Sequence, residues 1–159
     1  MALNKVEAKW LFVSRLTIGW LMFYAGVTKI IDPSWTAEGY GKGAKTFSAL
    51  FSWLVSPSNI GWINFVNEWG LTLLGVSLIL GIGVRLSSIL GAILMLFYYF
   101  PVLEFPYVEH GFLVDEHIIY ASILAFFAVV KAGRYYGLDN WCANLPICKR
   151  YPRLHKIWG

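Results

Sequence analysis

Four apolar stretches constrain the fold of this chain more than any other feature. They cover residues 10–31, 64–84, 86–104 and 115–130, and each is close to the roughly 20 residues that cross a hydrocarbon core about 30 Å thick. Backbone polar groups must be satisfied internally in lipid, so such stretches cross it as helices. The sequence therefore predicts an all-α integral membrane four-helix bundle in contact with the lipid bilayer.

The composition supports a membrane protein. The chain is 58% hydrophobic and only 14% charged, whereas a soluble domain is about a quarter charged. The formal net charge of +4 comes from residues at the ends of the apolar stretches. Because no basic stripe runs through a soluble fold, nucleic acid is excluded as a partner.

The basic residues are sorted between the two sides of the membrane. If both termini face the cytoplasm, the outside carries Lys29, Lys42 and Lys45, and the inside carries the other ten of the thirteen. The inner set is Lys5, Lys9, Arg15, Arg85, Lys131, Arg134, Lys149, Arg150, Arg153 and Lys156. This bias follows the positive-inside rule and predicts that both termini are cytoplasmic.

The chain divides into a transmembrane domain over residues 1–141 and a basic cytoplasmic tail over residues 142–159. Arg15 interrupts the first apolar stretch, which favours an uncleaved span over a signal peptide. Cys142 and Cys148 of the tail are expected to be reduced, inert thiols in the cytoplasm. Glycines Gly19 and Gly26 share one face of the first helix, where small residues allow close helix approach.

The outer loop over residues 32–63 contains a patterned segment. Apolar residues recur there at helical spacing: Phe47, Leu50, Phe51 and Leu54. They predict a short amphipathic helix that serves either as an interfacial anchor or as a lid over a site at the outer face. Trp62 and Tyr98, near predicted boundaries, are interpreted as part of the aromatic belt of the membrane interface.

Antiparallel packing brings one ionisable group from every helix to the outer level. These groups are Lys29, Glu68, Glu104 and the triplet Asp115, Glu116 and His117. Intramembrane ionisable groups usually face the bundle interior or a cavity, so the cluster predicts a site. Two alternatives remain open: Lys29 snorkels toward the headgroups, and the carboxylates of the triplet meet a helix dipole.

Glu68 and His117 are the predicted catalytic residues. Glu68 has apolar neighbours, so we expect it to pair with Lys29 or to stay protonated. Histidine is the side chain whose unperturbed pKa lies near neutrality, so His117 could exchange protons with a quinone, although a satisfied helix-end histidine is equally plausible. The residues predicted to bind substrate or quinone are Lys29, Asp115, Glu116 and Tyr120.

The other polar residues do not form the pattern of a metal or haem site. The three histidines include one on the opposite side, and no Glu-His pair has the spacing of di-iron bundles. No metal is therefore predicted. Arg15 and Arg85 at the inner rim are expected to be structural, in contact with lipid phosphate and helix-end carbonyls.

Several short motifs together resemble the DoxX/DoxD family of small membrane proteins. The resemblance covers about residues 11–141. The residues that carry it are Arg15, Leu16, Gly19, Ala25, Gly26, Lys29, Glu68, Leu73, Leu74, Gly75, the run 81–85, the run 113–120, the run 133–135, Leu138 and Asp139. By position, the polar family residues present are Arg15, Lys29, Glu68 and Arg85.

The resemblance implies a four-helix membrane domain linked to quinone redox chemistry. Namesakes of the family include the membrane subunit of thiosulfate:quinone oxidoreductase. It implies a subunit in the plasma membrane of a prokaryote that passes electrons from thiosulfate or another reduced sulfur compound to quinone at the outer face. A second redox subunit and a homo-oligomer are the implied protein partners. The alternative is a non-enzymatic membrane module that assembles or stabilises a partner redox enzyme, and a transporter is disfavoured because inverted repeats are absent.

Overall fold

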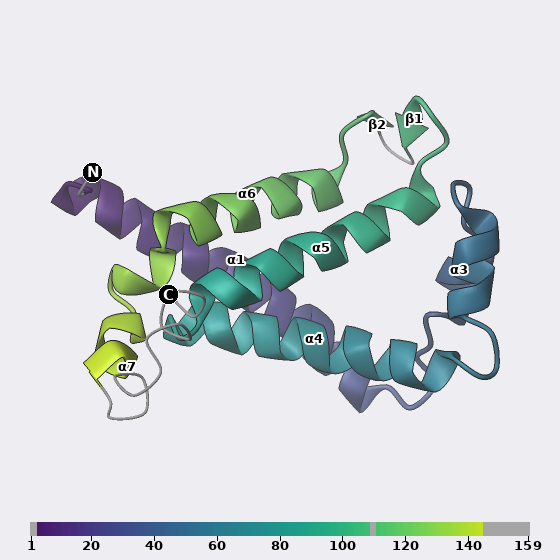
Figure 1. Cartoon of the computed structure of the whole chain (residues 1–159), viewed down its shortest axis with the longest axis horizontal. Coiled ribbons are helices and arrows are strands. Elements are labelled where there is room, and N and C mark those ends of the chain that lie inside the picture. Colours follow the sequence, from purple (N-terminus) through teal and green to yellow (C-terminus); the bar gives the residue numbers. More distant parts are fainter. Residues whose placement is uncertain (1–2, 109–110, 145–159) are drawn as a thin grey trace.

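The computed structural model describes residues 3–108 and 111–144, and most of these residues are helical (Figure 1). The four long helices are α1 (Lys5–Ile31), α4 (Ile60–Leu80), α5 (Val84–Val102) and α6 (Glu116–Val130). The shorter helices are α2 (Glu38–Lys42), α3 (Ser48–Leu54), the 3-10 helix η1 (Ala132–Arg134) and α7 (Asp139–Asn144).

Three of these helices are long and apolar enough to cross a membrane. They are α1, α4 and α5, with 27, 21 and 19 residues. The fourth apolar stretch forms α6, which has only 15 residues. The structure therefore shows three membrane-capable helices and one shorter apolar helix, and a fourth crossing stays a prediction.

A small β-hairpin joins α5 to α6 and departs from the all-α expectation. Strand β1 (Tyr107–Val108) pairs antiparallel with β2 (Gly111–Phe112), and the Tyr107 and Phe112 rings contact each other with centroids 5.9 Å apart. Pro106 lacks the N–H needed to continue a helix, so the chain turns here into extended structure. Glu109 and His110 lie outside the described residues, as do Cys148 and the tail from residue 145 onward.

Local signals set the helix ends. Asn4 and Glu7 form a reciprocal capping box at the start of α1. Helix α4 ends at Gly81, which has φ of 71°, and Gly83 with φ of 64° precedes α5. Both glycines hold the left-handed conformation that other residues rarely adopt, and they produce the tight turn between α4 and α5.

Helices α1 and α4 pack backbone against backbone. A Cβ on Gly26 would overlap the backbone nitrogen of Thr72, and a Cβ on Gly75 would overlap that of Phe23. A Cβ on Gly19 would lie 3.0 Å from the Cβ of Leu78. The predicted glycine face of the first helix is therefore confirmed as a contact surface.

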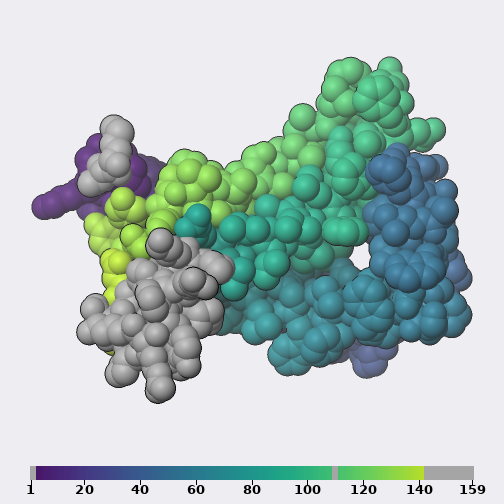
Figure 2. All heavy atoms as spheres, viewed as in Figure 1, coloured from purple at the N-terminus to yellow at the C-terminus, as the bar shows by residue number. Residues whose placement is uncertain are grey.

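The long helices form two contacting pairs, α1 with α4 and α5 with α6 (Figure 1). The pairs meet where α4 turns into α5, and there the Ser77 and Ser87 hydroxyls are 2.6 Å apart. From this end, called the inner end, α4 and α5 diverge toward the outer end, where α3 stands across the opening (Figure 1). The space-filling view is hollowed between α3, α4 and α5 (Figure 2).

The loop helix α3 is attached to the outer end of α5. The Lys45 amide donates to the Pro101 carbonyl at 2.8 Å. The Phe51 and Phe97 rings form an edge contact with centroids 6.4 Å apart. Helix α3 buries Phe51 and leaves Leu50 and Trp53 exposed, so the amphipathic character of this segment stays a prediction.

Candidate functional site

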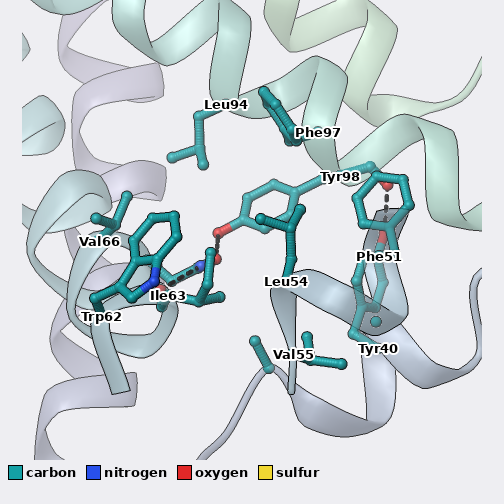
Figure 3. A pocket seen from close by; sticks show the side chains of 13 residues that line it. Tyr40, Phe51, Leu54, Val55, Trp62, Ile63, Val66, Leu94, Phe97 and Tyr98 are labelled. Atoms are coloured by element: carbon teal, nitrogen blue, oxygen red, sulfur yellow. Dashed lines mark hydrogen bonds between the residues drawn. The ribbon is translucent and has the colours of Figure 1, made fainter. Parts of the chain in front are cut away.

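A cavity of about 200 Å³ lies at the outer end between α3, α4 and α5 (Figure 3). Its walls are almost entirely apolar. The aromatic lining residues are Tyr40, Phe51, Trp62, Phe97 and Tyr98. Apolar walls with few polar groups are typical of sites for small organic ligands.

One corner of the cavity is polar. The Tyr98 hydroxyl donates to the Asn67 Oδ1, and the Asn67 Nδ2 donates to the Ile63 carbonyl at 2.8 Å (Figure 3). The Tyr40 hydroxyl donates to the Tyr98 backbone carbonyl. A carboxamide nitrogen carries two donors, so Asn67 has a second N–H for a ligand carbonyl.

The predicted residues His117 and Asp115 lie next to this corner. The His117 and Tyr98 rings have centroids 5.7 Å apart. Asp115 holds His117 through an Oδ2 to Nδ1 distance of 2.7 Å, and its Oδ1 accepts from the Ile118 amide at 3.1 Å as the N-cap of α6. Asp115 thus performs two tasks, capping a helix and orienting the imidazole that packs on Tyr98.

The expected ion pair between Lys29 and Glu68 does not form in the part of the chain that the structure describes. The Lys29 Nζ donates to the Ala25 carbonyl at 3.1 Å and lies 5.2 Å from the Trp35 ring centroid. A cation over an indole face is stabilised without a carboxylate. The pairing of Lys29 with Glu68 is therefore wrong for this structure, and neither residue lines the cavity.

The remaining predicted outer residues are dispersed. Glu104 and Glu116 are exposed, and Tyr120 packs partly buried against the helix core rather than the cavity. Of the ionisable groups predicted to lie together at the outer level, the structure thus brings Asp115 and His117 into contact. Glu104 lies beyond the end of α5, where it forms an isolated β-bridge with Tyr107.

Asp115, Glu116 and His117 offer ligand atoms within 4.8 Å of one another, so they could hold a metal ion. The Asp115 to His117 contact already uses one oxygen and one nitrogen of the group. The prediction that no metal is bound stays a prediction.

At the inner end, Arg15 is 0% exposed. Its Nη1 donates to the Ala132 carbonyl at 2.8 Å, its Nη2 donates to the Tyr136 carbonyl at 3.1 Å, and its Cζ lies 5.4 Å from the Phe12 ring centroid. The predicted contact with helix-end carbonyls is confirmed. The predicted contact with lipid phosphate is wrong, because the guanidinium is buried inside the protein.

Asp139 completes this inner cluster. It is buried, and its Oδ1 accepts from the Gly83 amide at 2.6 Å. Burial raises the pKa of the Asp139 carboxyl, and the amides of Gly83 and Val84 and the charges of Arg15 and Arg134 partly oppose that rise. We name Arg15, Ala132, Gly133, Tyr136 and Asp139 the inner knot.

Sequence reasoning did not identify Asn67, Tyr98 or Asp139 as site residues. Tyr98 was assigned to the aromatic belt, although its hydroxyl points into the protein (Figure 3). The signal for Asn67 was a carboxamide in an apolar helix, where an unpaired polar group is costly. The signal for Asp139 was its place in the motif that resembles the DoxX/DoxD family, but its partners come from other parts of the chain.

The profile of the DoxX family matches residues 10–103, which is more than half of the chain. The chain belongs to the DoxX family. The matched part runs from α1 to the end of α5, so it contains the cavity and Arg15 but not His117 or Asp139. The family match and the three membrane-capable helices together show that this DoxX protein is a membrane protein. No curated protein and no solved structure matches the chain.

Proposed function

We propose that this DoxX protein is the membrane subunit of a quinone-linked oxidoreductase in the plasma membrane of a prokaryote, and that quinone binds in the outer cavity. The observation that carries the proposal is an aromatic cavity with one polar corner, built between two membrane-capable helices. A quinone ring is flat and apolar on its faces, with carbonyl acceptors at its edge. The cavity offers both kinds of surface.

The polar corner suits a quinone carbonyl. The second N–H of Asn67 is the donor, because the first is engaged by Ile63 and the amide oxygen accepts from Tyr98. Asn67 is thereby held in one orientation. Preorganised donors of this kind bind a ligand without first paying an ordering cost.

A groove along α4 and α5 provides a path for the isoprenoid tail. It has a volume of about 710 Å³ and shares Val66, Leu94 and Phe97 with the cavity. From there it continues between the two helices as far as Ser77 and Ser87. A quinone from the bilayer would enter sideways, and α3 would act as the lid over its ring.

His117 is the proposed proton-exchanging residue. Reduction of a quinone to a quinol takes up two electrons and two protons, and His117 packs against the Tyr98 wall while Asp115 orients it. A histidine can exchange protons near neutral pH. His117 does not line the cavity itself and would act through the lining residue Tyr98. Lys29, Glu68, Glu116 and Tyr120 do not line it either, so catalysis by Glu68 and quinone binding by the others would also have to act from outside it.

The proposed electron donor is thiosulfate or another reduced sulfur compound, delivered at the outer end by a second redox subunit. A non-enzymatic assembly module is the second candidate. It is favoured by the exposed apolar face of α3, where Phe47 and Trp53 are each 59% exposed and Leu50 is 46% exposed. Such a face at the outer end suits a protein partner as well as a lipid interface.

Quinone binding to the purified protein in detergent tests the proposal. Trp62 lines the cavity, whereas Trp20 lies exposed on α1. We expect a saturable quench of tryptophan fluorescence whose saturable part is lost in Trp62→Phe and kept in Trp20→Phe. Asn67→Leu should weaken binding about tenfold, the value of roughly one hydrogen bond. A non-saturable quench, equal in both tryptophan variants, would reject the cavity and favour the assembly module.

A further inference from the structure

The outer cavity presents few polar atoms to a ligand, and most of them are already engaged. Four lining side chains carry hydrogen-bonding groups: Tyr40, Trp62, Asn67 and Tyr98. The two tyrosine hydroxyls donate to protein oxygens, and one N–H of Asn67 donates to the Ile63 carbonyl at 2.8 Å. Among the lining residues, all of which the structure describes, the side-chain donors left for a ligand are the second N–H of Asn67 and the indole N–H of Trp62.

Both of these donors belong to α4 and therefore to one side of the cavity. Figure 3 shows Trp62 on one side of the cavity and Leu54 and Phe51 on the other. The wall away from α4 is made by Phe51 and Leu54 of α3 and by Leu94 and Phe97 of α5. Hydrocarbon side chains donate no hydrogen bond, so a ligand oxygen that lies against this wall finds no side-chain partner.

The number and position of the ligand oxygens decide which quinone ring suits these walls. A 2,3-dimethoxy-1,4-benzoquinone carries two carbonyl and two methoxy oxygens around one ring, so some of them must lie against the apolar wall. A 1,4-naphthoquinone carries only the two carbonyl oxygens, and a fused hydrocarbon ring takes the place of the methoxy groups. A buried acceptor without a donor costs its desolvation free energy, whereas a fused ring gains contact with aromatic side chains.

We propose that the outer cavity selects 1,4-naphthoquinones over dimethoxybenzoquinones, and that Leu54 is a specificity-determining residue. The inference rests on the proposed quinone function and names the class of quinone that the same site takes. One carbonyl of the naphthoquinone would accept from Asn67, and the fused ring would lie against Leu54 and Phe97. Asparagine has nearly the shape of leucine and carries two amide donors, so Leu54→Asn would give this wall a partner for a methoxy oxygen.

Isothermal titration calorimetry of the full chain in detergent tests the selectivity, with 2-methyl-1,4-naphthoquinone and 2,3-dimethoxy-5-methyl-1,4-benzoquinone as tail-free probes. We expect the naphthoquinone to bind about tenfold more tightly, which corresponds to roughly one unmet acceptor. Leu54→Asn should lower this ratio of affinities about tenfold. The matched control Leu50→Asn makes the same change on the same helix, at a side chain that is 46% exposed and outside the cavity, and should change the ratio less than twofold. Comparing ratios between variants cancels the partition of each quinone into the micelle.

Leu94→Asn is a second test on the same wall, which decides the matter if Leu54→Asn does not fold. It places a donor on α5 instead of α3 and should lower the ratio in the same direction. Equal affinities of the wild-type protein for the two quinones would overturn the selectivity. So would a ratio that neither wall variant lowers, or one that Leu50→Asn lowers as much as Leu54→Asn. In each of these cases quinone still binds and the proposed function stands, whereas a wild-type protein that binds neither quinone would reject the proposed function and the selectivity together.

Discussion

Arg15 donates a hydrogen bond of 2.8 Å to the carbonyl of Ala132, a residue 117 positions further along the chain. The bond ties the first long helix to the segment that follows the last one. The same carbonyl also accepts from the Tyr135 amide at 3.2 Å, so it has two donors. Because the guanidinium is fully buried, this contact holds the inner end together from within the protein, where lipid and water do not compete.

Arg15→Met should lower the free energy of unfolding by about 3 kcal/mol, because the carbonyls of Ala132 and Tyr136 each lose a charged donor and Asp139 loses a nearby opposite charge. Unfolding by sodium dodecyl sulfate in mixed micelles measures the change. The matched control is Lys9→Met, an exposed position on the same helix, with an expected effect below about 0.5 kcal/mol. Equal effects of the two variants would contradict the role of the inner knot.

Gly133→Ala should destabilise the protein by about 2 kcal/mol or more, since the added Cβ would overlap the Oδ2 of Asp139. Gly61→Ala provides the control, because no atom lies within 4 Å of a Cβ at that position. In helix α4 the control should gain up to about 1 kcal/mol from better helix propensity. The same unfolding assay compares the two, and a neutral Gly133→Ala would mean that Asp139 does not occupy this position.

The stability of the protein should depend on the charge of Asp139. Its carboxyl pKa is raised above the ordinary value of 3.8 in the folded state, so the folded state holds the proton more firmly than the unfolded state. The resulting stabilisation is present below about pH 3.8 and is lost as the pH rises through the folded pKa. Asp139→Asn should remove this decline, which a comparison of thermal unfolding across the pH series would reveal.

Asp32 should affect stability with the opposite dependence on pH. Hydrogen bonds from the Ser34 hydroxyl and amide lower the pKa of the exposed Asp32 carboxyl. The contribution of Asp32 to the stability of the folded state is therefore present above the ordinary pKa, and it is lost as the pH falls through the lowered pKa. Asp32→Asn should leave the Asp139 decline in place. A decline that persists in Asp139→Asn would assign the effect to another group.

His117→Gln should reduce quinone reduction more than quinone binding if His117 exchanges protons. Glutamine keeps hydrogen-bonding capacity but does not titrate, so turnover should fall by roughly 10²-fold while the dissociation constant changes less than about threefold. Both quantities are measured on the same preparation with its redox partner. The comparison variant is Glu68→Gln, and a loss confined to that variant would move the proton role from His117 to Glu68.

The outer site could be predicted only in part. The contact of Asp115 with His117 could be predicted because the two residues are near neighbours in sequence. A contact over so few residues depends little on the fold. The pairing of Lys29 with Glu68 failed because it required the rotation of two helices about their axes, and Trp35 and Ala25 provide Lys29 with nearer partners. The cavity was missed since its walls come from four separate helices, α2, α3, α4 and α5.

The sequence by itself determined the apolar helices, their approximate ends, the turn at Gly81 and Gly83, and the glycine face by which the first helix packs. These features depend on hydrophobic length, caps and small residues, all of which act over one or two helical turns.

Tertiary structure alone decided which polar groups meet. Tyr98 bonds Asn67 from 31 positions away, and Arg15 reaches Ala132 from 117. Such contacts depend on the crossing angles and rotations of the helices. Packing of the whole core determines these angles, and no local sequence pattern specifies them.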